Sequence, residues 1–153
     1  MSSLIQHNTP PKFKDPGAPT ISCTIGNIEI ERALLDLRGS VNLLPYSVYQ
    51  QLGLWELKPT STVLQLADRS IKKPRGIVED VIIKVDKFYY LVDFIVLDTE
   101  PVPYSKKQIP VILGHPFLAT ANACINCRTG VMKISFGKYE NQAEHFQCLL
   151  ECT

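Results

Sequence analysis

The sequence predicts an all-β domain that contains one or two short helices, and three observations carry this prediction. Strand-like segments, alternating or continuously apolar, recur from about residue 20 to residue 136. Short turn sequences such as Gly26-Asn27 and Asp86-Lys87 separate them. The chain has 153 residues, of which 45% are hydrophobic and 20% charged, which suits one globular domain with its own core.

The first strands are expected to form a hairpin after a flexible lead. Residues 1–18 are polar, carry several prolines and lack periodicity, so they are interpreted as a linker. The segment "ISCTIGNIEIERALLD" then holds two alternating runs about Gly26-Asn27, a two-residue turn that suits a hairpin. The domain is expected to span residues 19–137, and residues 138–153 to form a tail.

Two segments share one arrangement, in which an apolar strand leads to a glycine-containing turn and then to a helix that begins at a proline. In the first, "ALLDLRGSVNLLPYSVYQQLGL", a short helix is expected between Pro45 and Gly53. In the second, "IPVILGHPFLATANA", a buried strand ends at Gly114 and Pro116 opens a helix. The pair hints at two related halves.

The middle third of the chain is predicted to be nearly all β. A strand is expected over residues 62–67, "TVLQLA", followed by a turn at Asp68-Arg69-Ser70. Two further strands, "GIVEDVIIKV" and "FYYLVDFIVLD", flank the turn at Asp86-Lys87. A loop from Thr99 to Gln108 and a last strand in "GVMKISFG" complete the prediction.

Charge and hydropathy exclude several classes of partner. The net charge is +1, so no strong field favours nucleic acid or acidic lipid. The one tight basic cluster, Lys72, Lys73 and Arg75, is interpreted as decoration of an exposed strand. No apolar stretch approaches the ~20 residues that span a bilayer, and no secretory signal is visible. We therefore expect neither a nucleic-acid nor a membrane partner.

The cysteines predict free thiols rather than a metal site. There are five of them and no signal peptide, which favours a reducing, intracellular compartment. Cys124 and Cys127 have the spacing of half a zinc site, but no second tight pair accompanies them. We expect no metal and no cofactor.

Asp36 is the candidate catalytic residue. An aspartate at a strand end commonly caps a turn. Here, however, an apolar strand delivers it, small residues follow, and a second apolar strand ends at Leu113-Gly114. Two carboxyls that share one proton can activate water and protonate the carbonyl oxygen of an amide. Because no second aspartate has a comparable setting, the other carboxylate would come from a second copy across a two-fold axis.

Four segments carry a family resemblance: "KDPGAPTISCTIGN", "ALLDLRGSVNLLP", "LGLWELKPTSTVLQLADRSIKKPRGIVEDVIIKVDKFYYLVDFIVLD" and "IPVILGHPFLATANACINCRTGVMKISFG". Taken in this order, they resemble the retropepsin-like aspartic protease domain of plant long-terminal-repeat retrotransposon gag-pol polyproteins, of the Ty3/Gypsy kind. The resemblance covers about residues 15–137. It implies a retropepsin-like acid protease barrel, with one lobe per chain, that works in the cytoplasm as a homodimer and cuts extended segments of its own polyprotein.

The resemblance also implies a role for each matched position. Asp36 matches the catalytic aspartate. The remaining matches are the active-site loop, the flap that closes over a peptide, and the residues that support the loop from behind. They are Leu37, Arg38, Gly39 and Ser40 for the loop; Leu66, Ala67, Asp68, Arg69, Ser70 and Ile71 for the flap; and Ile112, Leu113 and Gly114 for the support.

Two positions depart from the family pattern. The family reads Asp-Leu-Gly-Ala-Ser where this chain has Arg38 and Gly39 in the middle positions, and it usually has arginine where this chain has His115. Arg38 would be costly if its position needed glycine torsions, and a guanidinium beside two carboxylates favours the state in which both are charged. Alternatively the loop uses Gly39 as its tight point and Arg38 faces solvent. An active endopeptidase, a catalytically degenerate dimerisation domain and a peptide-binding or ubiquitin-chain-binding module all remain open.

Overall fold

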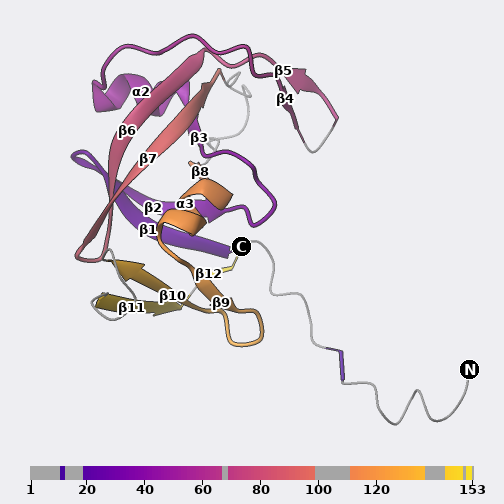
Figure 1. The fold of residues 1–153 in the computed structure, drawn as a ribbon, viewed down its shortest axis with the longest axis vertical. Coiled ribbons are helices and arrows are strands. Elements are labelled where there is room, and N and C mark those ends of the chain that lie inside the picture. Colours follow the sequence, from indigo (N-terminus) through magenta and orange to yellow (C-terminus); the bar gives the residue numbers. More distant parts are fainter. Residues whose placement is uncertain are drawn as a thin grey trace, which may run out of the picture.

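The structure is a computed structural model that describes residues 11–12, 19–66, 69–98, 111–136, 144–149 and 151–152. Most of these residues lie in strands, and two short helices accompany them (Figure 1), which confirms the predicted all-β class. Most of the predicted linker, and the whole predicted loop from Thr99 to Gln108, lie outside the described residues.

The largest sheet closes into a barrel. Its strand order is β12-β1-β2-β8-β3-β7-β6, and β6 also pairs with β1, so six of the seven strands form a closed ring. Closure leaves few unpaired edges in the ring. The strands are β1 (Pro19–Ile25), β2 (Ile28–Leu35), β3 (Leu43–Pro45), β6 (Gly76–Val85), β7 (Phe88–Leu97), β8 (Ile112–Leu113) and β12 (Glu151–Cys152).

Both predicted hairpins of the barrel are confirmed. β1 and β2 pair antiparallel about the turn at Gly26-Asn27, where Gly26 has a φ of 59°. β6 and β7 pair from Gly76↔Val96 to Val85↔Phe88 about the turn at Asp86-Lys87. A register shift between Val78 and Val81 marks a bulge in β6.

Both predicted helices are also confirmed. The helix α2 (Tyr46–Leu52) begins directly after Pro45 and ends at Gly53, whose left-handed φ of 59° closes the helix. The helix α3 (His115–Thr120) carries Pro116 in its first turn. Its Phe117 is fully buried, and the Tyr90 ring of β7 meets that side chain edge-on at 5.8 Å.

Two predicted strands are shorter in the structure. Of the described residues 62–66, only Leu64–Gln65 form a strand (β4), which pairs with β5 (Ile71–Lys72). Because β5 offers β4 only two residues to pair with, the pairing between the two strands is limited to Leu64–Gln65. In the described part of "IPVILG", residues 111–114, only Ile112–Leu113 are strand, since β8 pairs with just two residues of β2 and one of β3.

The described part of the expected tail, residues 144–149 and 151–152, forms strands. β11 (Glu144–Leu149) pairs along all of β10 (Val131–Phe136), and β9 (Cys124–Asn126) lies on the other side of β10. β12 pairs with β1 at Pro19↔Cys152 and Thr20↔Glu151. The partner of β12 is at the opposite end of the chain, and local apolar periodicity cannot reveal such a pairing.

Candidate active site

Asp36 lies where two neighbouring parallel strands end together. β2 and β8 pair in the register Leu34↔Ile112 and Leu35↔Leu113, so the two apolar strands with similar sequence surroundings lie side by side. The backbone N–H of Asp36 donates to the carbonyl oxygen of Leu113 at 2.9 Å. Asp36 is half-buried, so part of the residue remains accessible to solvent.

The loop after Asp36 folds back onto its carboxylate. The backbone N–H of Arg38 donates to Asp36 Oδ1 at 3.1 Å, and the N–H of Gly39 donates to the Asp36 carbonyl oxygen at 3.1 Å. A Cβ atom at Gly39 would lie 2.9 Å from Asp36 Oδ2 and 3.0 Å from its Cγ. A side chain at position 39 would therefore require the Asp36 carboxylate to move.

Arg38 does not occupy a glycine-only conformation. The described residues with left-handed φ values are four glycines and four other residues, and Arg38 is not among them. Its side chain is exposed. The geometry therefore agrees with the alternative in which Gly39 is the tight point of the loop and Arg38 faces solvent, and the expected torsional cost at Arg38 is absent.

The turn between β8 and α3 crosses directly behind this loop. A Cβ atom at Gly114 would collide with the carbonyl oxygen of Val41 and lie 2.8 Å from that of Gly39, so only glycine fits the crossing. The N–H of His115 donates to the Gly39 carbonyl oxygen at 2.7 Å. The expected supporting residues Leu113 and Gly114 thus contact the Asp36 loop through their backbones.

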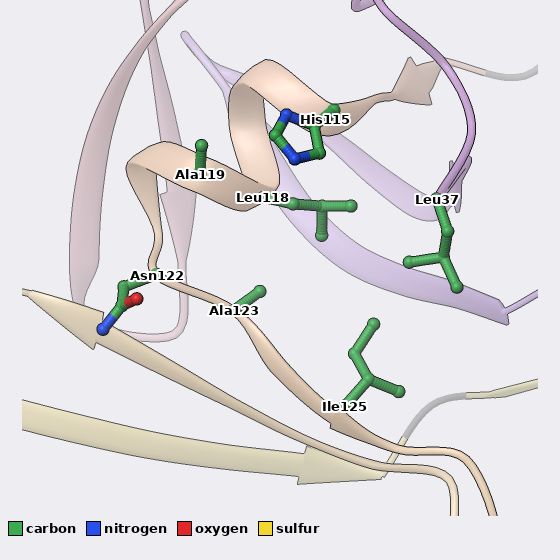
Figure 2. Close-up of a pocket in the computed structure, with 7 residues that line it drawn as sticks. All are labelled: Leu37, His115, Leu118, Ala119, Asn122, Ala123 and Ile125. Atoms are coloured by element: carbon green, nitrogen blue, oxygen red, sulfur yellow. The ribbon is translucent and has the colours of Figure 1, made fainter.

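A pocket of about 340 Å³ opens beside the loop that follows Asp36. Figure 2 shows Leu118 extending from α3 toward Leu37, with Ile125 of β9 reaching up from below and the His115 ring at the top. Leu37 is 49% exposed although it directly follows Asp36. Apolar periodicity did not predict this pocket, because nothing in the pattern distinguishes Leu118 and Ile125 from other apolar residues of a helix and a strand.

The expected flap is a small hairpin that stands away from the barrel, at the upper right of Figure 1. The N–H of Leu66 donates to the Ser70 carbonyl oxygen, and the N–H of Arg69 donates to the Leu66 carbonyl oxygen, both at 2.9 Å. Arg69 is exposed and Ile71 is 71% exposed. The expected flap residues Ala67 and Asp68 lie outside the described residues.

Sequence reasoning missed Asn42, which is 2% exposed. Its side-chain Oδ1 accepts from the N–H of Gly114 at 2.8 Å, and its Nδ2 donates to the carbonyl oxygen of Asp93 at 3.1 Å. A lone polar residue just before the apolar run "LLP" was the only available signal.

The three cysteines whose side chains the structure describes are free thiols. Cys23 is buried in the core, and burial raises the pKa of its thiol to about 12, which keeps it protonated. Cys124 and Cys127 are free and exposed. Within the described ranges, no three His, Cys, Asp or Glu side chains are grouped so as to hold a metal ion, and no helix is long and apolar enough to cross a membrane.

Comparison with known proteins finds the fold but no sequence relative. No family model and no curated protein matches the chain. Among solved structures, the chain is similar to the retroviral protease-like domain of Ddi1 from Leishmania major, with a TM-score of 0.59 and 14% sequence identity. The match covers 77% of this chain and 88% of that domain. The fold is therefore that of the retropepsin-like acid proteases, with one lobe per chain.

Proposed function

We propose that this chain is an aspartic endopeptidase that acts as a homodimer, in which two Asp36 carboxylates activate a water molecule against a peptide bond. The observation that carries the proposal is the setting of Asp36. Its carboxylate lies at the joint end of β2 and β8, over a glycine and beside a backbone N–H donor. Such a carboxylate is held in one orientation and remains open to a partner on its exposed side.

The chemistry requires the second copy. One carboxyl can either accept a proton from water or donate one to the carbonyl oxygen, whereas two carboxyls that share a proton do both at once. A two-fold axis beside Asp36 would supply the second group from an identical loop. Leu37 is exposed next to Asp36 and lines the adjacent pocket, so apolar surface is available where the second copy would meet this one.

The proposed substrate is an extended peptide segment of a polyprotein. The β4–β5 hairpin exposes Ile71 and, just before β4, Val63, which is 56% exposed. An extended peptide can add backbone hydrogen bonds to such a hairpin, and closing over the peptide would exclude water from the carboxylates. The family resemblance favours a plant Ty3/Gypsy retrotransposon polyprotein as that substrate and the cytoplasm as the place of cleavage.

A second candidate function is favoured by Arg38. Its exposed side chain lies two residues after Asp36, so a homodimer would carry one such group in each of its two loops. Two such guanidinium groups near the paired carboxylates favour the doubly ionised pair, which has no proton to donate. The alternative is therefore a domain that dimerises or binds peptides without cutting them.

The experiment is incubation of the full chain with an extended peptide library at mildly acidic pH, beside the Asp36→Asn variant. The endopeptidase predicts cleavage that is lost in Asp36→Asn while the circular dichroism spectrum and thermal midpoint stay close to those of the wild type. Peptide binding without cleavage by both proteins would instead support the binding module.

A further inference from the structure

Three successive residues at the end of β8 and in the turn that follows are hydrogen-bonded to the segment between residues 36 and 42. Leu113 accepts the N–H of Asp36 on its carbonyl oxygen, and His115 donates its N–H to Gly39. Between them, Gly114 donates its N–H to the side chain of Asn42. The first two contacts are between backbones, so the Asn42 amide is the side chain that completes this series.

Asn42 is in turn anchored to the wall of the barrel. Its Nδ2 donates to the Asp93 carbonyl oxygen, and its own carbonyl oxygen accepts the N–H of Ile95 at 2.9 Å. Both partners belong to β7, the long strand of the second hairpin. The side chain therefore links β7 with the turn that supports the Asp36 loop.

Only a neutral side chain with one acceptor and one donor fits this position. The Asn42 amide uses its oxygen on one side and its nitrogen on the other, and no buried side-chain nitrogen or oxygen atom of the described residues lacks a partner. A polar group left unpaired in a buried position destabilises the local arrangement by about 1–3 kcal/mol.

We propose that Asn42 is a positioning residue for Asp36, which fixes the orientation of the carboxylate by holding Gly114 against β7. The inference rests on the proposed function for its catalytic consequence. Asn42 reaches the carboxylate through Gly114 and its neighbours, without itself meeting the reacting atoms. Loss of its amide should therefore lower kcat and leave KM nearly unchanged.

Asn42→Asp gives a test that depends on pH. When protonated, the introduced carboxyl can accept from Gly114 with one oxygen and donate its proton to the Asp93 carbonyl oxygen, as the amide does. When ionised, it has no proton for that oxygen, and two electronegative atoms face each other. Burial favours the neutral form, so the variant should resemble the wild type at mildly acidic pH and fail as the pH rises.

The experiment compares Asn42→Asp, Asn42→Leu and the control Asn27→Asp with the wild type at each pH. Asn27 lies in the exposed β1–β2 turn, so its substitution tests the added charge alone. The readouts are amide hydrogen-exchange protection at Gly114, the carbon-13 resonance of the Asp36 carboxyl, and kcat. The first two do not depend on cleavage, so an inactive wild type would overturn the proposed function while these readouts still decide the role of Asn42.

We expect Asn42→Leu to lose Gly114 protection by about tenfold at every pH and to shift the Asp36 resonance. Asn42→Asp should do so only at neutral pH, with kcat falling in parallel, and Asn27→Asp should match the wild type throughout. Unchanged Gly114 protection and an unchanged Asp36 resonance in Asn42→Leu would overturn the proposal. An equal loss of protection at all amides would overturn it as well, since that result shows general destabilisation.

Discussion

At the scale of single residues, the tight point of the loop is at Gly39, whereas the family pattern has its glycine at the position of Arg38. A Cβ atom at Gly39 would press on the Asp36 carboxylate, whereas Arg38 has an ordinary backbone and an exposed side chain. Restoring the family order by placing glycine at position 38 and alanine at position 39 would therefore disturb Asp36 unless the loop also shifts. The remaining objection to activity is the charge of Arg38 and not its backbone.

Arg38→Ala should raise the rate of cleavage. The substitution removes an exposed cation two residues from Asp36 and needs no unusual torsion angles. A nearby cation favours loss of the shared proton, so the upper limb of the pH–rate profile should move to higher pH in Arg38→Ala. The control is Lys133→Ala, which removes an exposed positive charge from β10. Identical profiles for wild type and Arg38→Ala would show that the guanidinium does not act on the site.

Cys23 predicts how stability depends on alkaline pH. Burial raises its pKa from 9.0 to about 12, so the folded chain holds this proton more tightly than the unfolded chain does. The resulting contribution to stability is complete below about pH 9 and is lost as the pH rises toward 12. The free energy of unfolding, measured by denaturant titration, should fall over that range, and less steeply in Cys23→Ala. The exposed Cys124→Ala should keep the wild-type slope; equal slopes in all three proteins would contradict the assignment.

At the scale of elements, the sequence predicts most reliably what is decided locally. The turn at Gly26-Asn27 and the helix end at Gly53 both use left-handed glycine, and both were predicted. The β12–β1 pairing joins opposite ends of the chain, and the Asn42 contact with Gly114 spans 72 residues. Such contacts depend on how the whole barrel closes, and a local pattern contains no information about that closure.

A hydrogen bond joins β7 to β10, the strand that contains Ser135, and it leads to a prediction at the scale of elements. The Tyr90 hydroxyl donates to the Ser135 carbonyl oxygen at 2.9 Å, and the N–H of Ser135 donates to the carbonyl oxygen of Ala121 just after α3. Tyr90→Phe keeps the ring in place and leaves that partly buried oxygen without this donor. We expect a loss of about 1 kcal/mol in the free energy of unfolding.

Tyr89→Phe is the matched control for this prediction. Tyr89 precedes Tyr90 on the same strand but is 54% exposed, so removal of its hydroxyl should change the free energy of unfolding by less than about 0.5 kcal/mol. Thermal or urea unfolding of the two variants beside the wild type measures the difference. Equal stabilities of Tyr90→Phe and Tyr89→Phe would contradict the role given to the Tyr90–Ser135 hydrogen bond.

At the scale of the whole molecule, one chain supplies a complete barrel but only half of the proposed chemistry. The closed ring of strands, the hairpin β4–β5 and the pocket beside Leu37 are all present in a single copy. The strand β8, which runs parallel to β2, ends at Leu113 and is followed by Gly114, so it offers no second aspartate beside Asp36. Activity should therefore belong to a pair of chains and should fall on dilution as the pair dissociates.

The most direct test of this account is a mixing measurement, in which an increasing excess of Asp36→Asn is added to a fixed concentration of wild-type chain. If each active site needs two Asp36 carboxylates, wild-type chains are drawn into mixed pairs and the rate of peptide cleavage falls toward zero. The same excess of Lys133→Ala, whose Asp36 is intact, should raise the rate. A cleavage rate that stays constant as Asp36→Asn is added, under conditions where the chains exchange partners, would contradict the shared site.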